Sequence, residues 1–145
     1  MYRGTTHGFG AAAFHARCDG RARLLVLVRA REGGWLFGGF TAVGFIPGPV
    51  RAYADPSAFL FSLTNSLGRP EKLESKRTGE DIYYHPSDAA CFYDDLFICG
   101  NADTKADSGT NAGRAYTASA SIGAHPMARG YQGGWLAAEV VAWAV

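Results

Sequence analysis

Cysteine is scarce in this sequence, and its spacing forms no paired motif. The three cysteines are Cys18, Cys91 and Cys99. An odd number cannot all pair, and none of them stands in a Cys-x-x-Cys arrangement. The sequence also lacks an Asn-x-Ser/Thr acceptor for glycosylation. These absences argue against a secreted, disulfide-built domain, so we expect an intracellular, cytoplasmic protein.

An excess of one charge sign is also absent. Fourteen basic and thirteen acidic residues give a net charge of +1, so no global field favours nucleic acid, and we expect no nucleic-acid partner. The charge is uneven, because residues 1–50 hold six Arg against only Asp19 and Glu32. This segment predicts either ordinary solvated surface or a basic patch for an acidic partner, made of Arg17, Arg21, Arg23, Arg29 and Arg31.

Long hydrophobic runs are missing as well. The longest aliphatic run is Leu24 to Val28, whereas about 20 apolar residues are needed to cross a bilayer. The N-terminus has no apolar core of signal-peptide length. We therefore expect no membrane insertion and a soluble chain, whose length fits a single domain over residues 1–145.

A catalytic constellation is the last absence. The four histidines have no spacing typical of a metal site, and no Ser, Thr or Cys has a nucleophile signature. The adjacent acids Asp94 and Asp95 would point to opposite faces of a strand, and Asp95 is better explained by turn chemistry. The residues therefore predict a non-enzyme, with no cofactor, no metal and no small-molecule substrate.

What is present is mostly the pattern of β-strands. We expect strands at residues 24–28, 35–45, 58–63, 72–76, 82–84, 90–93, 96–99, 116–121 and 135–145. The apolar run 24–28 predicts a strand covered on both faces, and 58–63 another buried strand. Residues 72–76 alternate as an edge strand does, and the doubly apolar end of the chain predicts a central strand.

Glycines and polar residues mark the connections. Gly38 and Gly39 indicate a bulge or a close backbone approach. A two-residue turn at Asp94-Asp95 would place Tyr93 opposite Leu96, although a single bent strand is also compatible with the pattern. The polar stretch 100–115 predicts one long loop, either functional or mobile.

One helix is expected near the start. Its apolar stripe includes Phe9, Phe14 and Cys18. Thr6 is the preferred cap, and Asp19-Gly20 indicates the stop.

Glu139 is the odd residue of the last strand, since it is a lone acid among apolar neighbours. A buried carboxylate must be paired or hydrogen-bonded. We therefore expect a buried structural acid paired with an arginine.

The order of several local patterns resembles the TLDc domain of the oxidation-resistance proteins, over almost all of the 145 residues. The segments are Tyr2 to Gly4, Phe14-His15, Cys18 to Gly20, Gly34 to Thr41, Asp55-Pro56, Ala58 to Leu63, Asp95 to Ile98 and Leu136 to Trp143. The N-terminal segment is most similar to the versions in protists and algae. The polar loop 100–115 matches nothing in the family pattern.

The resemblance implies a fold and a function. The fold is α+β and mostly β, with two antiparallel sheets packed as a sandwich beside one N-terminal helix and short helical turns. The function is a non-catalytic protein-interaction domain linked to oxidative-stress protection, whose partners are subunits of the vacuolar proton-pumping ATPase (V-ATPase). The candidate contact residues are Arg3, Thr5, His7, Arg21 and Arg23.

Two alternatives stay open. One alternative is a constitutive small subunit of another large assembly. A thiol-based redox protein is the rival class, and it needs an exposed cysteine with a lowered pKa.

Overall fold

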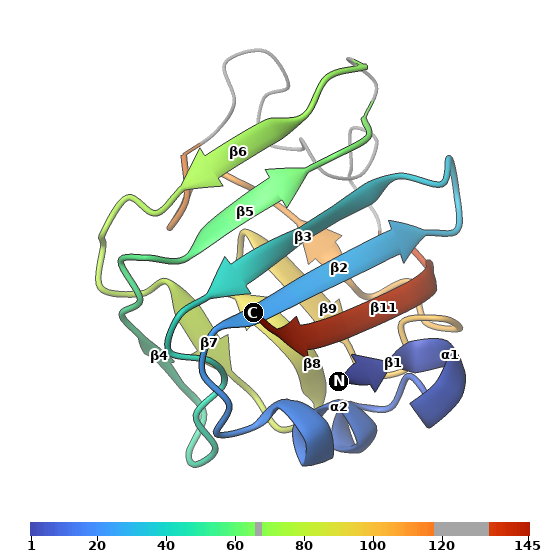
Figure 1. Ribbon diagram of the computed structural model, residues 1–145, viewed down its shortest axis with the longest axis horizontal. Coiled ribbons are helices and arrows are strands. Elements are labelled where there is room, and N and C mark those ends of the chain that lie inside the picture. Colours follow the sequence, from blue (N-terminus) through green and yellow to red (C-terminus); the bar gives the residue numbers. More distant parts are fainter. Residues whose placement is uncertain (66–67, 118–133) are drawn as a thin grey trace.

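The strands of the computed structural model form one large antiparallel sheet and two smaller ones (Figure 1). The structure describes residues 1–65, 68–117 and 134–145. The six-stranded sheet has the order β1-β11-β2-β3-β5-β6, the three-stranded sheet β10-β9-β8, and the two-stranded sheet β4-β7. The mostly β class with packed antiparallel sheets is thus confirmed.

The six-stranded sheet faces the viewer in Figure 1, with β7, β8 and β9 behind it. Its strands are β1 (Tyr2–Arg3), β2 (Leu24–Ala30), β3 (Leu36–Thr41), β5 (Phe59–Ser62), β6 (Glu71–Glu74) and β11 (Ala137–Ala144). The others are β4 (Arg51–Tyr53), β7 (Ile82–Tyr84), β8 (Asp88–Phe92), β9 (Leu96–Cys99) and β10 (Gly109–Thr110). Side chains from both layers fill one core, in which Val26, Leu60, Phe92 and Ile98 are fully buried.

Two short helices, rather than one, precede β2. They are α1 (Gly4–His7) and α2 (Ala11–Cys18). Gly8, with φ of 89°, separates them in a conformation that favours glycine. The expected cap at Thr6 is therefore wrong, since Thr6 lies inside α1 and Gly10 precedes α2 without a side-chain cap. The stop at Asp19 is confirmed, because its N–H bonds the carbonyl of His15.

The central strands differ from expectation in how they are covered. In β2 burial alternates along the strand, so only one face is covered and the expectation for residues 24–28 is wrong. Strand β11 lies between β2 and the two-residue β1, which places it next to an edge rather than at the centre. Neighbouring atoms approach the β3 backbone closely at Gly38 and Gly39. There is no bulge at these glycines, because the β2–β3 register runs through them unbroken. The edge position of the segment around β6 is confirmed.

The hairpin between β8 and β9 has a different register from the one predicted. Leu96 pairs with Phe92 rather than with Tyr93. The reason is local, since Tyr93 takes a left-handed conformation with φ of 48° and the turn spans residues 93–95. One residue more in the turn shifts every pair that follows.

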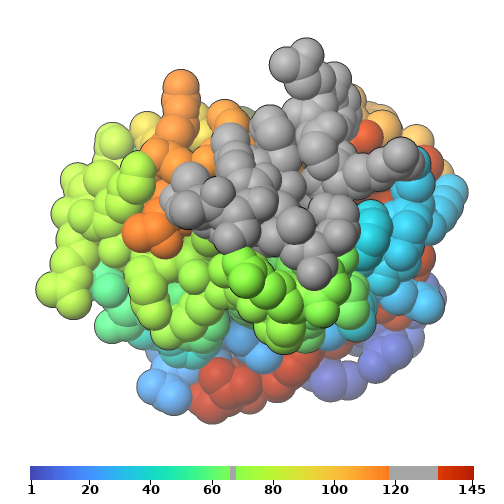
Figure 2. Space-filling model, turned by 90° about the horizontal axis from the view of Figure 1, so that it is seen from above, coloured from blue at the N-terminus to red at the C-terminus, as the bar shows by residue number. Residues whose placement is uncertain are grey.

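The stretch 100–115 is more ordered than a single loop. It contains β10, which pairs with β9, and Lys76 N donates to the carbonyl of Ala115. Figure 2 shows this orange segment against the yellow-green residues after β6, and the bridge between Ser75 and Tyr116 continues the contact. Of the strand expected at 116–121, Tyr116 forms that bridge and residues 118–121 lie outside the described part of the chain.

Candidate interaction surface

The outward face of the six-stranded sheet is apolar, although no described helix or strand lies in front of β2, β3 and β5 (Figure 1). In β2, Leu24, Val26 and Val28 point into the core, so Leu25 and Leu27 point outward. The register places further apolar residues beside them on the same face: Leu36 and Phe40 in β3, Phe59 and Phe61 in β5, and Val141 and Trp143 in β11. These side chains are partly buried by one another, Phe61 and Val141 are only 9% exposed, and Leu63 at the margin of the face is 45% exposed. An apolar face that the fold leaves uncovered is typical of interaction sites.

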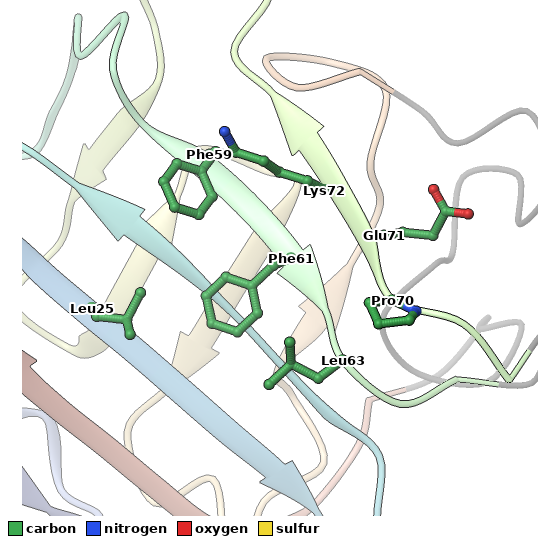
Figure 3. A pocket seen from close by; sticks show the side chains of 7 residues that line it. All are labelled: Leu25, Phe59, Phe61, Leu63, Pro70, Glu71 and Lys72. Carbon is green, nitrogen blue, oxygen red and sulfur yellow. The ribbon is translucent and has the colours of Figure 1, made fainter.

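A hollow of about 460 Å³ lies in this face (Figure 3). Its lining residues come from β2, β5 and the start of β6: Leu25, Phe59, Phe61, Leu63, Pro70, Glu71 and Lys72. In Figure 3 the side chains of Leu25 and Phe61 face each other across β3. The hollow is large enough to receive bulky apolar side chains of another molecule.

Gly38 in β3 lies next to the hollow, beneath the ring of Phe61. The register places it between Leu27 and Phe61. A Cβ atom at Gly38 would lie 1.9 Å from Val26 O and 2.9 Å from the ring of Phe61. Only glycine therefore lets β2 and β3 keep this spacing while Phe61 lies over β3.

Aromatic rings with cations above them border the hollow. The rings of Phe40 and Phe59 stack with centroids 5.2 Å apart. Lys72 Nζ lies 4.3 Å from the centre of the Phe59 ring, and Arg23 Cζ lies 5.8 Å from that of Phe40. Such contacts hold the cations against the apolar face.

Arg3 and Thr5 contact Glu139 near one end of β11, and His7 contacts Arg3. Arg3 Nη1 lies 3.6 Å from Glu139 Oε2. The carboxylate also accepts hydrogen bonds from Thr5 N at 3.1 Å and Thr5 Oγ1 at 2.5 Å. His7 Nδ1 accepts a bond from Arg3 N at 3.0 Å, which closes α1 onto β1.

The Glu139 carboxyl is partly buried, with 14% of its side chain exposed. Burial by itself raises the pKa, yet the bonds from Thr5 and Val140 together with the charge of Arg3 lower the pKa of Glu139 below its ordinary value. This acid therefore fastens the N-terminal segment to the sheet in its charged form.

Arg21 and Arg23 lie at the other end of β11. Arg23 Nε donates to the carbonyl of Val145 at 3.0 Å, and Val145 N donates to the carbonyl of Arg23. Glu139 and Val145 are six residues apart, which is about 20 Å along a strand. The structure therefore does not bring Arg3 and His7 together with Arg21 and Arg23.

The cysteines do not provide the site that the redox alternative needs. Cys18, Cys91 and Cys99 are all free and buried. Burial raises the pKa of Cys18 to about 12 and also raises that of Cys91. Both thiols are thus held in the protonated, weakly nucleophilic form.

Two aspartates of the quoted patterns have structural roles. Asp55 Oδ2 accepts bonds from Thr41 Oγ1 and from the backbone N–H groups of Ala42 and Val43. Asp95 accepts four backbone N–H bonds from residues 113–116. Both acids are buried and hold loops to the sheets.

The comparison with protein families agrees with these patterns. The family model for the TLDc domain matches residues 1–120. The chain belongs to the TLDc family. A comparison with curated proteins gives no match. In this TLDc domain β11 lies beyond the matched residues, yet it completes the large sheet between β1 and β2.

The described part of this TLDc domain contains no group of three or more His, Cys, Asp or Glu side chains placed to hold a metal ion. Within the same ranges, no helix has the length and hydropathy needed to span a membrane.

Sequence reasoning missed the outward apolar face. The signal was present, because residues 24–28, 58–63 and 140–145 are apolar on both faces. In a two-layer sandwich each sheet has only one covered face. When several strands are apolar on both faces, the fold leaves the apolar side chains of one face uncovered. Such side chains indicate an interaction surface.

Proposed function

We propose that this TLDc domain is a non-catalytic, intracellular protein-interaction domain that binds and regulates a V-ATPase, with a role in oxidative-stress protection. Family membership supports the link to oxidative-stress resistance. The V-ATPase is the partner that the family resemblance implies. The observation that carries the interaction role is the apolar hollow on the outward face of the sheet, lined by Leu25, Phe61 and Leu63.

The composition of this surface suits a protein partner. Its centre is aromatic and aliphatic, and its borders carry Lys72 and Arg23. Protein interfaces have the same anatomy, with an apolar centre that holds most of the binding energy and a polar rim.

The test begins with affinity capture of the tagged full chain from its native lysate, followed by direct titration with purified V-ATPase and an ATP-hydrolysis assay. We expect V-ATPase subunits in the capture, a saturable titration and a changed hydrolysis rate. No binding to the purified enzyme would overturn the V-ATPase assignment. A stoichiometric complex with other proteins would instead support a constitutive subunit of that assembly.

A pair of matched variants assigns the binding to the surface. Leu63, which is 45% exposed, lines the hollow, whereas Val50, 49% exposed, lies in the loop before β4. We expect Leu63→Asp to weaken V-ATPase binding by about tenfold or more, as for interface residues that carry binding energy. Val50→Asp should leave it unchanged, and equal effects of the two variants would reject this face.

A further inference from the structure

We infer that the outward face of β2, β3 and β5 binds an amphipathic helix of the partner that carries acidic residues toward both of its ends. This inference rests on the proposed interaction role of the same face, and it specifies the chemistry of the partner. Three observations carry it: the apolar centre of the face, the placement of two arginines, and the pairing of the carboxylates that share the face.

Strand β2 places a cation at each end of an apolar centre. Its outward positions begin with Arg23, directly before the strand, continue through Leu25 and Leu27, and end at Arg29. The contact of Arg23 with the outward ring of Phe40 places its guanidinium on this face. Arg29 is exposed opposite Leu36 and Glu139.

The carboxylates of the face are already paired. Glu71, which lines the hollow, lies 2.9 Å from Arg69 Nε, and Glu74 lies 2.7 Å from Lys72 Nζ. Glu139 is held by Arg3 and Thr5. Among the described residues, neither Arg23 nor Arg29 forms an ion pair with a carboxylate. The face therefore has an excess of positive charge that its own acids do not offset, and it complements an acidic partner.

The geometry favours a helix over an extended peptide. An extended peptide adds to the edge of a sheet through backbone bonds, whereas the side-chain face of a sheet packs against a helix or another sheet. Arg23 and Arg29 are about 20 Å apart along β2. That distance corresponds to about 13 residues of helix.

A second copy of this chain fits the face less well. Packing the face on itself about a twofold axis would bring the arginines of one copy toward those of the other. Like charges facing each other at an interface are unfavourable. An acidic helix has the opposite complementarity, since it neutralises both arginines while its apolar stripe enters the hollow.

The test uses two synthetic helical peptides of about 18 residues with one shared Leu/Phe stripe. One has glutamates at the flanking polar positions, and the other has lysines there. Binding of each labelled peptide to the full chain is followed by fluorescence anisotropy. We expect the acidic peptide to bind about tenfold tighter or more at low salt, with the ratio falling in high salt.

Charge-reversal variants locate the effect. Arg29→Glu should reduce the preference for the acidic peptide, and Arg23→Glu with Arg29→Glu should reverse it. Arg77→Glu, on the loop between β6 and β7, is the matched control and should change nothing. Leu63→Asp should weaken both peptides, because both use the hollow. Since Arg23 also binds Val145, the single Arg29 variant keeps the test valid if the double variant folds poorly.

Three results would overturn the inference: equal binding of the two peptides, no binding of the acidic one, or the same response to Arg77→Glu as to Arg29→Glu. Self-association that the peptides do not compete with would assign the face to a second copy. The peptide experiment contains no V-ATPase. Failure of the V-ATPase titration with successful peptide binding would therefore reject only the named partner.

Discussion

Single carboxylates fasten loops and termini in this domain, and the contacts of Glu139 depend on its charged form. Its pKa is lowered because hydrogen bonds from Thr5 and Val140 and the charge of Arg3 outweigh the effect of burial. A lowered pKa stabilises the folded state above the unfolded value, ordinarily 4.5, and this contribution is lost as the pH falls through the folded value. Glu139→Gln should therefore lower stability near neutral pH and reduce the dependence of stability on pH below about 4.5.

Urea unfolding of both proteins across that pH range measures the difference. The control is Asp107→Asn, an exposed acid just before β10, which should follow the wild-type curve. Parallel pH curves for wild type and Glu139→Gln would show that the carboxylate contributes nothing in its charged form.

Asp95 and its neighbour Asp94 allow a direct comparison of two acids in one turn. Asp95 is fully buried and accepts four backbone N–H bonds, whereas Asp94 is 54% exposed and pairs with Arg114. Asp95→Ala would leave buried amides without acceptors, so we expect a loss of at least about 3 kcal/mol in the free energy of unfolding. Asp94→Ala should cost less than about 1 kcal/mol, as for exposed ion pairs.

Thermal and urea unfolding of the two variants check this comparison. The stretch 109–116 should also lose amide protection in Asp95→Ala, because Asp95 holds residues 113–116. Similar losses for both variants would mean that the buried carboxylate has no special role.

Strand β3 shows at the scale of an element how one residue sets the spacing of a sheet. A Cβ at Gly38 would lie 1.9 Å from Val26 O, so the β2–β3 pair would have to move apart. We expect Gly38→Ala to lower the free energy of unfolding by about 2 kcal/mol or more. Gly10→Ala is the matched control, since its nearest atom would be 3.8 Å away and the change should cost less than about 1 kcal/mol.

Chemical unfolding gives the free energies, and the affinity for the acidic helical peptide shows whether the hollow still binds. Gly38→Ala should weaken peptide binding as well, because Phe61 lies over Gly38. A stability equal to that of Gly10→Ala would indicate that the strands relax without cost.

The reactivity of the three cysteines measures how well the whole molecule is packed, because they lie in three different elements, α2, β8 and β9. Their exposed fractions are 1% for Cys18, 2% for Cys91 and 8% for Cys99. Burial keeps the thiols away from reagents, so we expect slow labelling by iodoacetamide in the native state and fast labelling in urea.

Mass spectrometry of the labelled peptides gives the rate for each cysteine separately. An exposed Ser→Cys variant, at Ser57, serves as the fast-reacting control. Fast labelling of any native cysteine, at a rate close to that control, would restore the thiol-based redox alternative.

The β-rich class, the TLDc family and the positions of most strands could be predicted from the sequence. Alternation, glycine punctuation and apolar runs are local properties, and they persist whatever packs against them. These local properties predicted the last strand and the edge position of β6. The helix cap and the hairpin register could not be, because each depends on one residue with a positive φ, Gly8 and Tyr93 respectively.

Tertiary structure alone decided which apolar faces are covered. The run Leu24 to Val28 has the same composition whether its second face meets the core, a partner or solvent. Likewise, the sequence contains Arg3, His7, Arg21 and Arg23, but the antiparallel pairing of β11 with β1 and β2 separates them into two places. Composition and periodicity are determined along the chain, whereas a surface is made by strands distant in sequence, so only the packed sheet fixes its shape and charge.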